Sequence, residues 1–174
     1  MELEALKYPI GIFDCPTTIS SQTLDAWISI LEHFPNRLRT LVEGLSENQL
    51  NTPYRPGGWN VRQVIHHMYD SHHNSYTRFK WALTEDTPVI KAYNEADWAT
   101  SSDYINAPID LSVKAITSLH AKLVFLLKGL SEDDFQKEFI HPEKKEKVSL
   151  AENTGIYAWH CNHHYAHIEN LIKR

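Results

Sequence analysis

The sequence predicts an all-α protein, a four-helix bundle with an extended N-terminal arm and a long crossover between the second and third helices. Apolar residues recur at steps of three and four along four long segments, which is the spacing of one helix face. No convincing series of strands accompanies them, and four amphipathic helices are sufficient to enclose a core. A length of 174 residues fits one domain, so residues 1–174 are interpreted as a single bundle.

The first long helix is predicted from Ser20 to about Leu45. Its apolar face consists of Leu24, Trp27, Ile28, Leu31, Phe34, Leu38, Leu41 and Leu45. Pro35 lies within this segment and removes one backbone donor, so we expect a kink near Leu31 or a short break. Residues 1–18 contain prolines and a glycine without a sustained period, which predicts an extended arm lying on the body.

The second helix has a well-marked N-terminus after Trp59. Asn60 can cap the free amides, and the Gln63 side chain can reach back as in a capping box. The apolar positions of this helix continue to about Leu83. Residues 84–109 contain two prolines and many polar side chains, so we expect them to form the long crossover rather than a tight hairpin.

The third helix is predicted to begin at a cap formed by Asp110 and to end near Gly129. Its apolar stripe includes one polar ring, that of His120. The segment from Phe135 to Val148 is charged and compatible with strands, which indicates a small hairpin.

The last helix is predicted to run to about Ile172. Ser149 followed by Glu152 forms a second capping-box pattern, although Asn153 or Thr154 could cap the helix instead. This helix carries four of the eleven histidines of the chain.

Composition excludes several classes of function. Lys and Arg number 17 against 22 Asp and Glu, a net charge of −5, so the chain lacks the basic surface that nucleic-acid binding needs. The sequence contains two cysteines, Cys15 and Cys161, which can form at most one bridge, so a disulfide framework is excluded. Both are expected to be free thiols in a reducing cytosol. The acidic N-terminus does not resemble a signal peptide, and no apolar run is long enough to span a membrane. We therefore expect a cytoplasmic protein.

The spacing of the histidines predicts a metal site. His160 and His164 are four residues apart, so their side chains project from one helix face and can share an ion. A third ligand should come from the second helix, which offers His66, His67, His72 and His73. His67 lies on the inward apolar stripe, whereas His66 points about a quarter turn away. The predicted ligands are therefore His67, His160 and His164.

The remaining histidines are not assigned as metal ligands. His66, His72, His73, His163 and His167 are expected at the surface or as groups that support the ligands. His120 is expected to be a core histidine with one hydrogen bond.

Three neutral imidazoles leave a tetrahedral ion one ligand short, and an open position that carries water is typical of a catalytic site. Zinc is the preferred ion and nickel the alternative. Other metal chemistries fit less well, because His-Glu-x-x-His is absent and the one Glu-x-x-His pair abuts Pro142. Cys161 is interpreted as a packed residue and Asp70 as a helix carboxylate, so neither is assigned a catalytic role.

Several motifs resemble one family. They are Gly58-Trp59-Asn60-Val61-Arg62-Gln63-Val64-Ile65-His66-His67-Met68-x-Asp70-Ser71, Arg55-Pro-Gly-Gly-Trp59, Asn74-Ser-Tyr-x-Arg-Phe-Lys80, Trp159-His160-x-x-x-His164-x-x-His167-Ile168 and Tyr8-Pro-Ile-Gly11. Over almost the whole chain they are similar to DinB-like metalloproteins, and within these to the YfiT group. Its members are described as metal-dependent hydrolases and are associated with bacillithiol transferase activity. The resemblance implies a divalent metal at His67, His160 and His164, an unusual helix order and a homodimer.

We therefore expect a metal-dependent hydrolase that acts on a small-molecule substrate. The first alternative is a metal-dependent S-transferase that conjugates a low-molecular-weight thiol to electrophiles. The second is a non-catalytic, dimeric metal-binding module. An accessible cavity above the ion favours an enzyme, whereas a closed coordination sphere favours the binding module.

Overall fold

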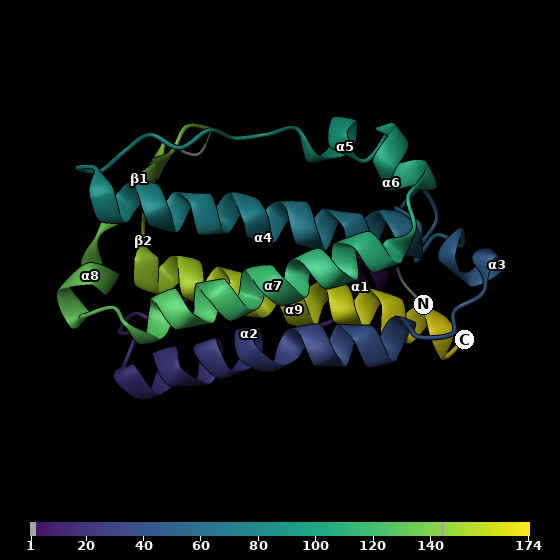
Figure 1. Ribbon diagram of the computed structural model, residues 1–174, viewed down its shortest axis with the longest axis horizontal. Coiled ribbons are helices and arrows are strands. Elements are labelled where there is room, and N and C mark those ends of the chain that lie inside the picture. Colours follow the sequence, from purple (N-terminus) through teal and green to yellow (C-terminus); the bar gives the residue numbers. More distant parts are fainter. Residues whose placement is uncertain (1–2, 144) are drawn as a thin grey trace.

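A computed structural model describes residues 3–143 and 145–174 as four long helices with short elements at their ends (Figure 1). The long helices are α2 (Ser21–Val42), α4 (Val61–Thr84), α7 (Ile109–Lys128) and α9 (Leu150–Ile172). Helices α2 and α4 each pack against both α7 and α9, so α2 and α4 face each other across a diagonal. The predicted four-helix bundle is confirmed, and the crossover between α4 and α7 runs along the outside of the bundle.

Local capping chemistry explains where three of the four helices begin. Ser20, Asn60 and Ser149 each accept a hydrogen bond from the backbone amide three residues later. At Asn60 the capping box is complete, because Gln63 also accepts from the Asn60 amide at 3.0 Å. The predicted starts of the second and last helices are thus confirmed, and Ser149 rather than Asn153 or Thr154 caps α9.

The predicted cap of the third helix was wrong. Helix α7 begins at Ile109, and the N-cap residue is Pro108, which makes no side-chain capping bond. Asp110 lies inside the first turn, where its carboxylate pairs with Lys114 at 2.6 Å and faces the positive end of the helix dipole. The end of the helix at Gly129 was predicted correctly.

Pro35 does not break the first long helix. Helix α2 is continuous from Ser21 to Val42. Since proline has no N–H, the carbonyl of Leu31, four residues earlier, loses its usual helical partner. His120 Nδ1 of α7 donates to this carbonyl at 2.7 Å, so the neighbouring helix satisfies the group that the proline leaves free.

The N-terminal arm is less extended than expected, because it starts with a short helix, α1 (Leu3–Lys7). Beyond α1 the arm lies on α9, where Trp159 Nε1 donates to the carbonyl of Gly11 at 3.3 Å. Phe13 and Trp27 press against Gly155, where an added Cβ would lie within 2.9 Å of both rings. Glycine at this position allows the arm and α2 to approach α9 closely.

Short elements lie in the segments that connect the long helices. They are α3 (Glu47–Leu50), α5 (Glu95–Trp98), α6 (Ser102–Asn106), α8 (Glu132–Gln136), β1 (Glu138–His141) and β2 (Glu146–Ser149). The two strands pair antiparallel, which confirms the predicted hairpin. The crossover contains α5 and α6, two helices that we did not predict. Within the described residues, no helix is long and apolar enough to cross a membrane.

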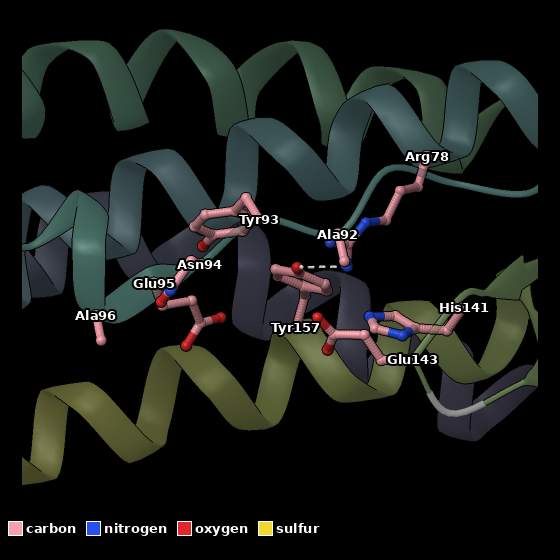
Figure 2. Close-up of a pocket in the computed structure, with 9 residues that line it drawn as sticks. All are labelled: Arg78, Ala92, Tyr93, Asn94, Glu95, Ala96, His141, Glu143 and Tyr157. Atoms are coloured by element: carbon pink, nitrogen blue, oxygen red, sulfur yellow. Dashed lines mark hydrogen bonds between the residues drawn. The ribbon is translucent and has the colours of Figure 1, made fainter.

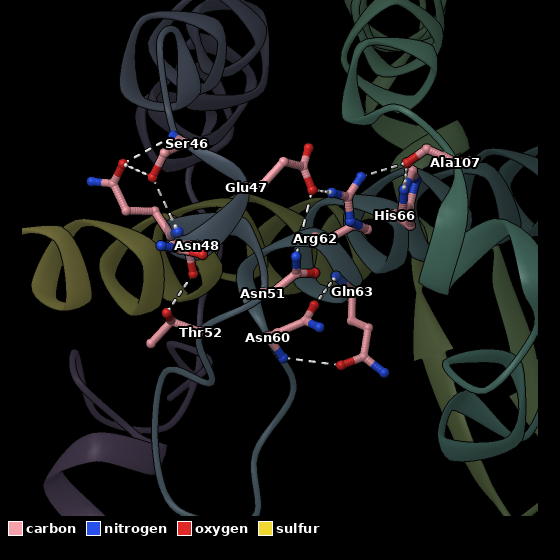
Figure 3. A network of polar contacts seen from close by, with 11 residues as sticks. Ser46, Glu47, Asn48, Asn51, Thr52, Asn60, Arg62, Gln63, His66 and Ala107 are labelled. Carbon is pink, nitrogen blue, oxygen red and sulfur yellow. Dashed lines mark hydrogen bonds and ion pairs between the residues drawn. The ribbon is translucent and has the colours of Figure 1, made fainter.

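A buried arginine ties the crossover to the start of α4 (Figure 3). The Arg62 side chain is 7% exposed, pairs with Glu47 of α3 at 2.6 Å and donates to the carbonyl of Ala107 at 2.8 Å. His66 bonds to the same carbonyl at 3.2 Å and to the Ser112 hydroxyl at 2.8 Å. These contacts direct His66 away from the α4 face that carries His67.

Candidate metal centre

The inward faces of α4 and α9 bring the three predicted ligands together. The potential ligand atoms of His67, His160 and His164 all lie within 4.8 Å of one another. His67 Nε2 is 3.2 Å from His160 Nε2. Two nitrogens that are each about 2.0–2.1 Å from a tetrahedral zinc ion lie about 3.3 Å apart, so this spacing fits a shared ion.

Burial keeps these rings neutral. It lowers the pKa of His67 to about 4 and, together with neighbouring imidazoles, holds the pKa values of His160 and His164 well below the ordinary value. Neutral imidazoles have a lone pair to donate, as metal binding requires. The Nδ1 atom of His67 is buried and has no hydrogen-bond partner among the described residues.

A cavity of about 330 Å³ opens over the three rings. Aromatic side chains form much of its wall, namely Tyr8, Tyr54, Trp59 and Trp159, and Glu95 supplies a carboxylate. The Trp59 ring lies 4.7 Å from that of His67, between centroids. A small molecule can therefore reach the histidine nitrogens along an apolar wall.

A second cavity, whose lining residues Figure 2 shows, has a volume of about 590 Å³ and shares two of these residues with the first. Glu95 of α5 and Tyr157 of α9 line both cavities. Arg78 and His141 line the outer one, and Arg78 Nη1 donates to the Tyr157 hydroxyl at 3.4 Å. The two cavities give a substrate room to extend from the histidines to a guanidinium group.

The structure separates the other histidines into distinct roles. His73 is exposed, and His66 lies in the polar contacts at the start of α4. His120 is buried in the core as predicted, but it makes two hydrogen bonds rather than one. His72 and His167 each contact a predicted ligand, at 3.1 Å to His160 and at 3.3 Å to His164.

The aromatic wall and the adjoining cavity could not be assigned from the sequence. Tyr8 and Trp59 belong to the motifs that carry the family resemblance, and this signal could have placed them near the site. Cys161 is fully buried, as expected for a packed residue, and burial raises the pKa of its thiol well above the ordinary value. Burial raises the pKa of the Asp70 carboxyl group, and the nearby Tyr104 hydroxyl of α6 acts in the opposite direction.

The fold and the site together define a class of protein, a helical bundle with a candidate metal centre of three inward histidines beneath an accessible cavity. Residues 30–168 match the DinB superfamily, and the chain belongs to it. A relative from Bacillus pumilus, named "Putative metal-dependent hydrolase", is 46% identical over 99% of this chain and 98% of its own length. The Bacillus subtilis relative named "Putative metal-dependent hydrolase YfiT" is 44% identical over 97% and 95% of the two chains.

A solved structure shares the fold. It is that of YfiT from Bacillus subtilis, described as a probable metal-dependent hydrolase with an unusual four-helix bundle topology. The match has a TM-score of 0.96 and 44% identity, and covers 98% of this chain and 97% of that chain. The family resemblance that the motifs indicated is confirmed.

We expect the bundle to remain folded when metal is removed. The apolar core extends along all four helices, from Ile28 and Leu38 of α2 to Ile168 of α9, and does not depend on an ion. Far-UV circular dichroism before and after dialysis against a chelator should therefore show the same helicity, with only the lower melting temperature that loss of a ligand causes. Loss of most helicity would identify the centre as structural, as in a zinc finger.

Proposed function

We propose that the chain is a metal-dependent hydrolase whose divalent ion is held by His67, His160 and His164. Zinc is the preferred ion and nickel the alternative. The observation that carries the proposal is the convergence of three neutral ring nitrogens at the floor of an open cavity. The names of the relatives support the reaction class.

A divalent ion supplies a Lewis acid with an open position, which can activate water at neutral pH or hold a thiolate. The residues around the ion would bind the substrate, exclude water and transfer protons. Trp59 and Trp159 offer flat apolar surfaces that bind the body of a substrate and exclude water. Glu95 is placed to take up or release a proton at the cavity wall, and Arg78 can bind an anionic group in the outer cavity.

Thiol S-transfer is the second candidate function. It is favoured by the two adjoining cavities that share Glu95 and Tyr157, because a transferase must hold a thiol and an electrophile together. The open cavity argues against a purely metal-binding module, in which a closed ligand set is expected. The homodimer that the family resemblance implies stays a prediction.

One assay separates these functions. Zinc-loaded and metal-free protein are incubated with a chromogenic aryl ester or an electrophilic aryl chloride, each with and without a low-molecular-weight thiol. We expect metal-dependent product from water alone; product that requires the thiol would instead support transfer. Matched His160→Ala and His73→Ala variants serve as the inactive form and the control. Equal rates of product formation with and without metal, together with equal rates in the two variants, would contradict the assignment of an enzyme active site to this centre.

A further inference from the structure

A row of ring-to-ring hydrogen bonds continues behind the candidate ligand His160. His160 Nδ1 is 3.1 Å from His72 Nε2, and His72 Nδ1 is 3.0 Å from His120 Nε2. The row ends at the backbone, where His120 Nδ1 is 2.7 Å from the carbonyl oxygen of Leu31. His72 is 0% exposed and His120 is 1% exposed, so each ring depends on these contacts for its hydrogen bonds.

The carbonyl at the end sets the direction of the whole row. A carbonyl oxygen only accepts, so the proton of His120 lies on Nδ1. A neutral imidazole carries one N–H, which leaves His120 Nε2 as an acceptor and requires His72 to donate from Nδ1. By the same step, His160 donates from Nδ1 to His72 Nε2. Its Nε2, which faces His67, then carries a bare lone pair.

A shorter row determines the proton position of the second ligand on α9. His167 Nε2 is 3.0 Å from the carbonyl oxygen of Lys7 and therefore carries the proton of that ring. His167 Nδ1 must then accept from His164 Nδ1, which is 3.3 Å away. His164, like His160, is left with its lone pair on Nε2.

We propose that His72, His120 and His167 are positioning residues that fix the tautomers of His160 and His164, so that both ligands present a bare Nε2 to the ion. The inference rests on the ligand assignment made under the proposed function and extends it to the groups behind the ligands. A hydrogen bond to the far ring nitrogen fixes the orientation of a metal-binding histidine and raises its basicity. Here neutral histidines and backbone carbonyls provide that bond.

The third ligand has a different environment. His67 Nδ1 has no partner among the described residues, so no hydrogen bond there fixes its proton. In the metal-free chain, His67 Nε2 must donate to the bare Nε2 of His160, 3.2 Å away. Metal binding at Nε2 would move this proton to Nδ1. His67 is therefore the ligand whose tautomer should change when zinc binds.

Two other groups have a spacing that would also permit an ion, and each is a competing explanation: His163 with His164 and His167, and His72 with His120 and Cys161. In the first group, the hydrogen bonds already use both ring nitrogens of His167. The hydrogen bonds already use both ring nitrogens of His72. An ion there would also require the Cys161 thiolate, which burial disfavours. The row of hydrogen bonds accounts for these groups without a second ion.

Nitrogen-15 NMR of the full-length chain tests the tautomers directly. Long-range proton–nitrogen spectra are recorded on metal-free and zinc-loaded protein, and the rings are assigned with single His→Gln variants. We expect the proton on Nδ1 of His72, His120, His160 and His164, and on Nε2 of His167, in both states. A proton on Nε2 of His160 or His164 in metal-free protein would overturn the proposal. These metal-free spectra are decisive even if the chain binds no zinc, which would contradict only the proposed function.

Variants at His72 separate hydrogen bonding from packing. His72→Leu removes the acceptor for His160, and we expect zinc affinity to fall by about 10- to 100-fold with helicity retained. His72→Gln keeps one acceptor and one donor and should recover most of that loss, while the exposed neighbour His73→Gln should bind zinc as the unmodified chain does. Equal losses in the Leu and Gln variants, or a second zinc ion per chain that His72→Gln abolishes, would overturn the positioning role.

Discussion

Replacement of His160 by alanine is expected to reduce the bound divalent metal from one ion per chain to a small fraction of that value. His160 is the centre of the cluster, since its Nε2 lies 3.2 Å from His67 Nε2 and its ring centroid lies 4.4 Å from that of His164. Two remaining imidazoles do not form a tight zinc site, which takes at least three protein ligands. Metal analysis of purified protein after dialysis measures the effect. His67→Ala and His164→Ala should give the same loss.

His66 offers a matched control for this experiment. It is adjacent to His67 on α4 and is also buried, but its ring bonds to Ser112 and to the carbonyl of Ala107. His66→Ala should therefore leave the metal content unchanged, although it lowers stability by removing buried hydrogen bonds. An unchanged metal content in all three ligand variants would contradict the ligand assignment. Loss of metal in His66→Ala would show that the wrong histidine of α4 was chosen.

The metal-free chain is expected to lose stability steeply as the pH falls from about 6.5 toward 4. Burial lowers the pKa of His67, His120 and His167 to about 4 in the folded chain, while these rings titrate near 6.5 when unfolded. Between these values the unfolded state binds more protons, so its free energy falls relative to the folded state. Above pH 6.5 the neutral rings make their full contribution to the free energy of unfolding. This contribution is lost as the pH falls below 6.5 and through about 4, the pKa of these rings in the folded chain.

The expected effect is large for a domain of this size. At pH 5, each such ring lowers the free energy of unfolding by roughly 2 kcal/mol, and several rings together approach the ~5–15 kcal/mol stability of a typical domain. Burial raises the pKa of the Asp70 and Glu95 carboxyl groups, which acts in the opposite direction, but these are two groups against at least three rings. Urea denaturation at pH 7.5 and pH 5 measures the difference.

Variants can assign this acid sensitivity to the buried rings. His120→Gln should reduce the pH dependence, because one of the rings that titrates on unfolding is removed. The exposed His33→Gln should leave it unchanged. If the free energy of unfolding is the same at pH 7.5 and pH 5, the buried rings do not stay neutral in the folded chain, which would contradict the environment described for the centre.

The long helices could be predicted from the sequence because their signals are local. The Asn60 and Gln63 pair marks the start of α4 by a contact within one turn, and the apolar spacing shows which face turns inward. The five short helices α1, α3, α5, α6 and α8 were missed, because helices of four or five residues are not stable alone and form only where the rest of the chain holds them. Asp110 was placed at a cap because a proline N-cap offers no side-chain acceptor to detect.

The candidate ligands could be chosen from the sequence, whereas the groups behind them could not. His67 follows from its place on the apolar stripe of α4, and His160 and His164 from their spacing. The contact between His72 and His120 joins α4 to α7, so it depends on how the two helices are rotated against each other. The carbonyl of Lys7 is a backbone group, and no residue type marks it as an acceptor for His167.

The N-terminal arm lies outside the stretch over which the chain matches its superfamily, residues 30–168. Nevertheless, Lys7 supplies the carbonyl that orients His167, and Tyr8 forms part of the cavity wall. The stretch that matches the superfamily and the set of residues that form the site therefore have different boundaries in this chain. A fragment trimmed to residues 30–168 would retain all three candidate ligands and lose the support of one of them, so truncation is a poor route to a minimal version of this centre.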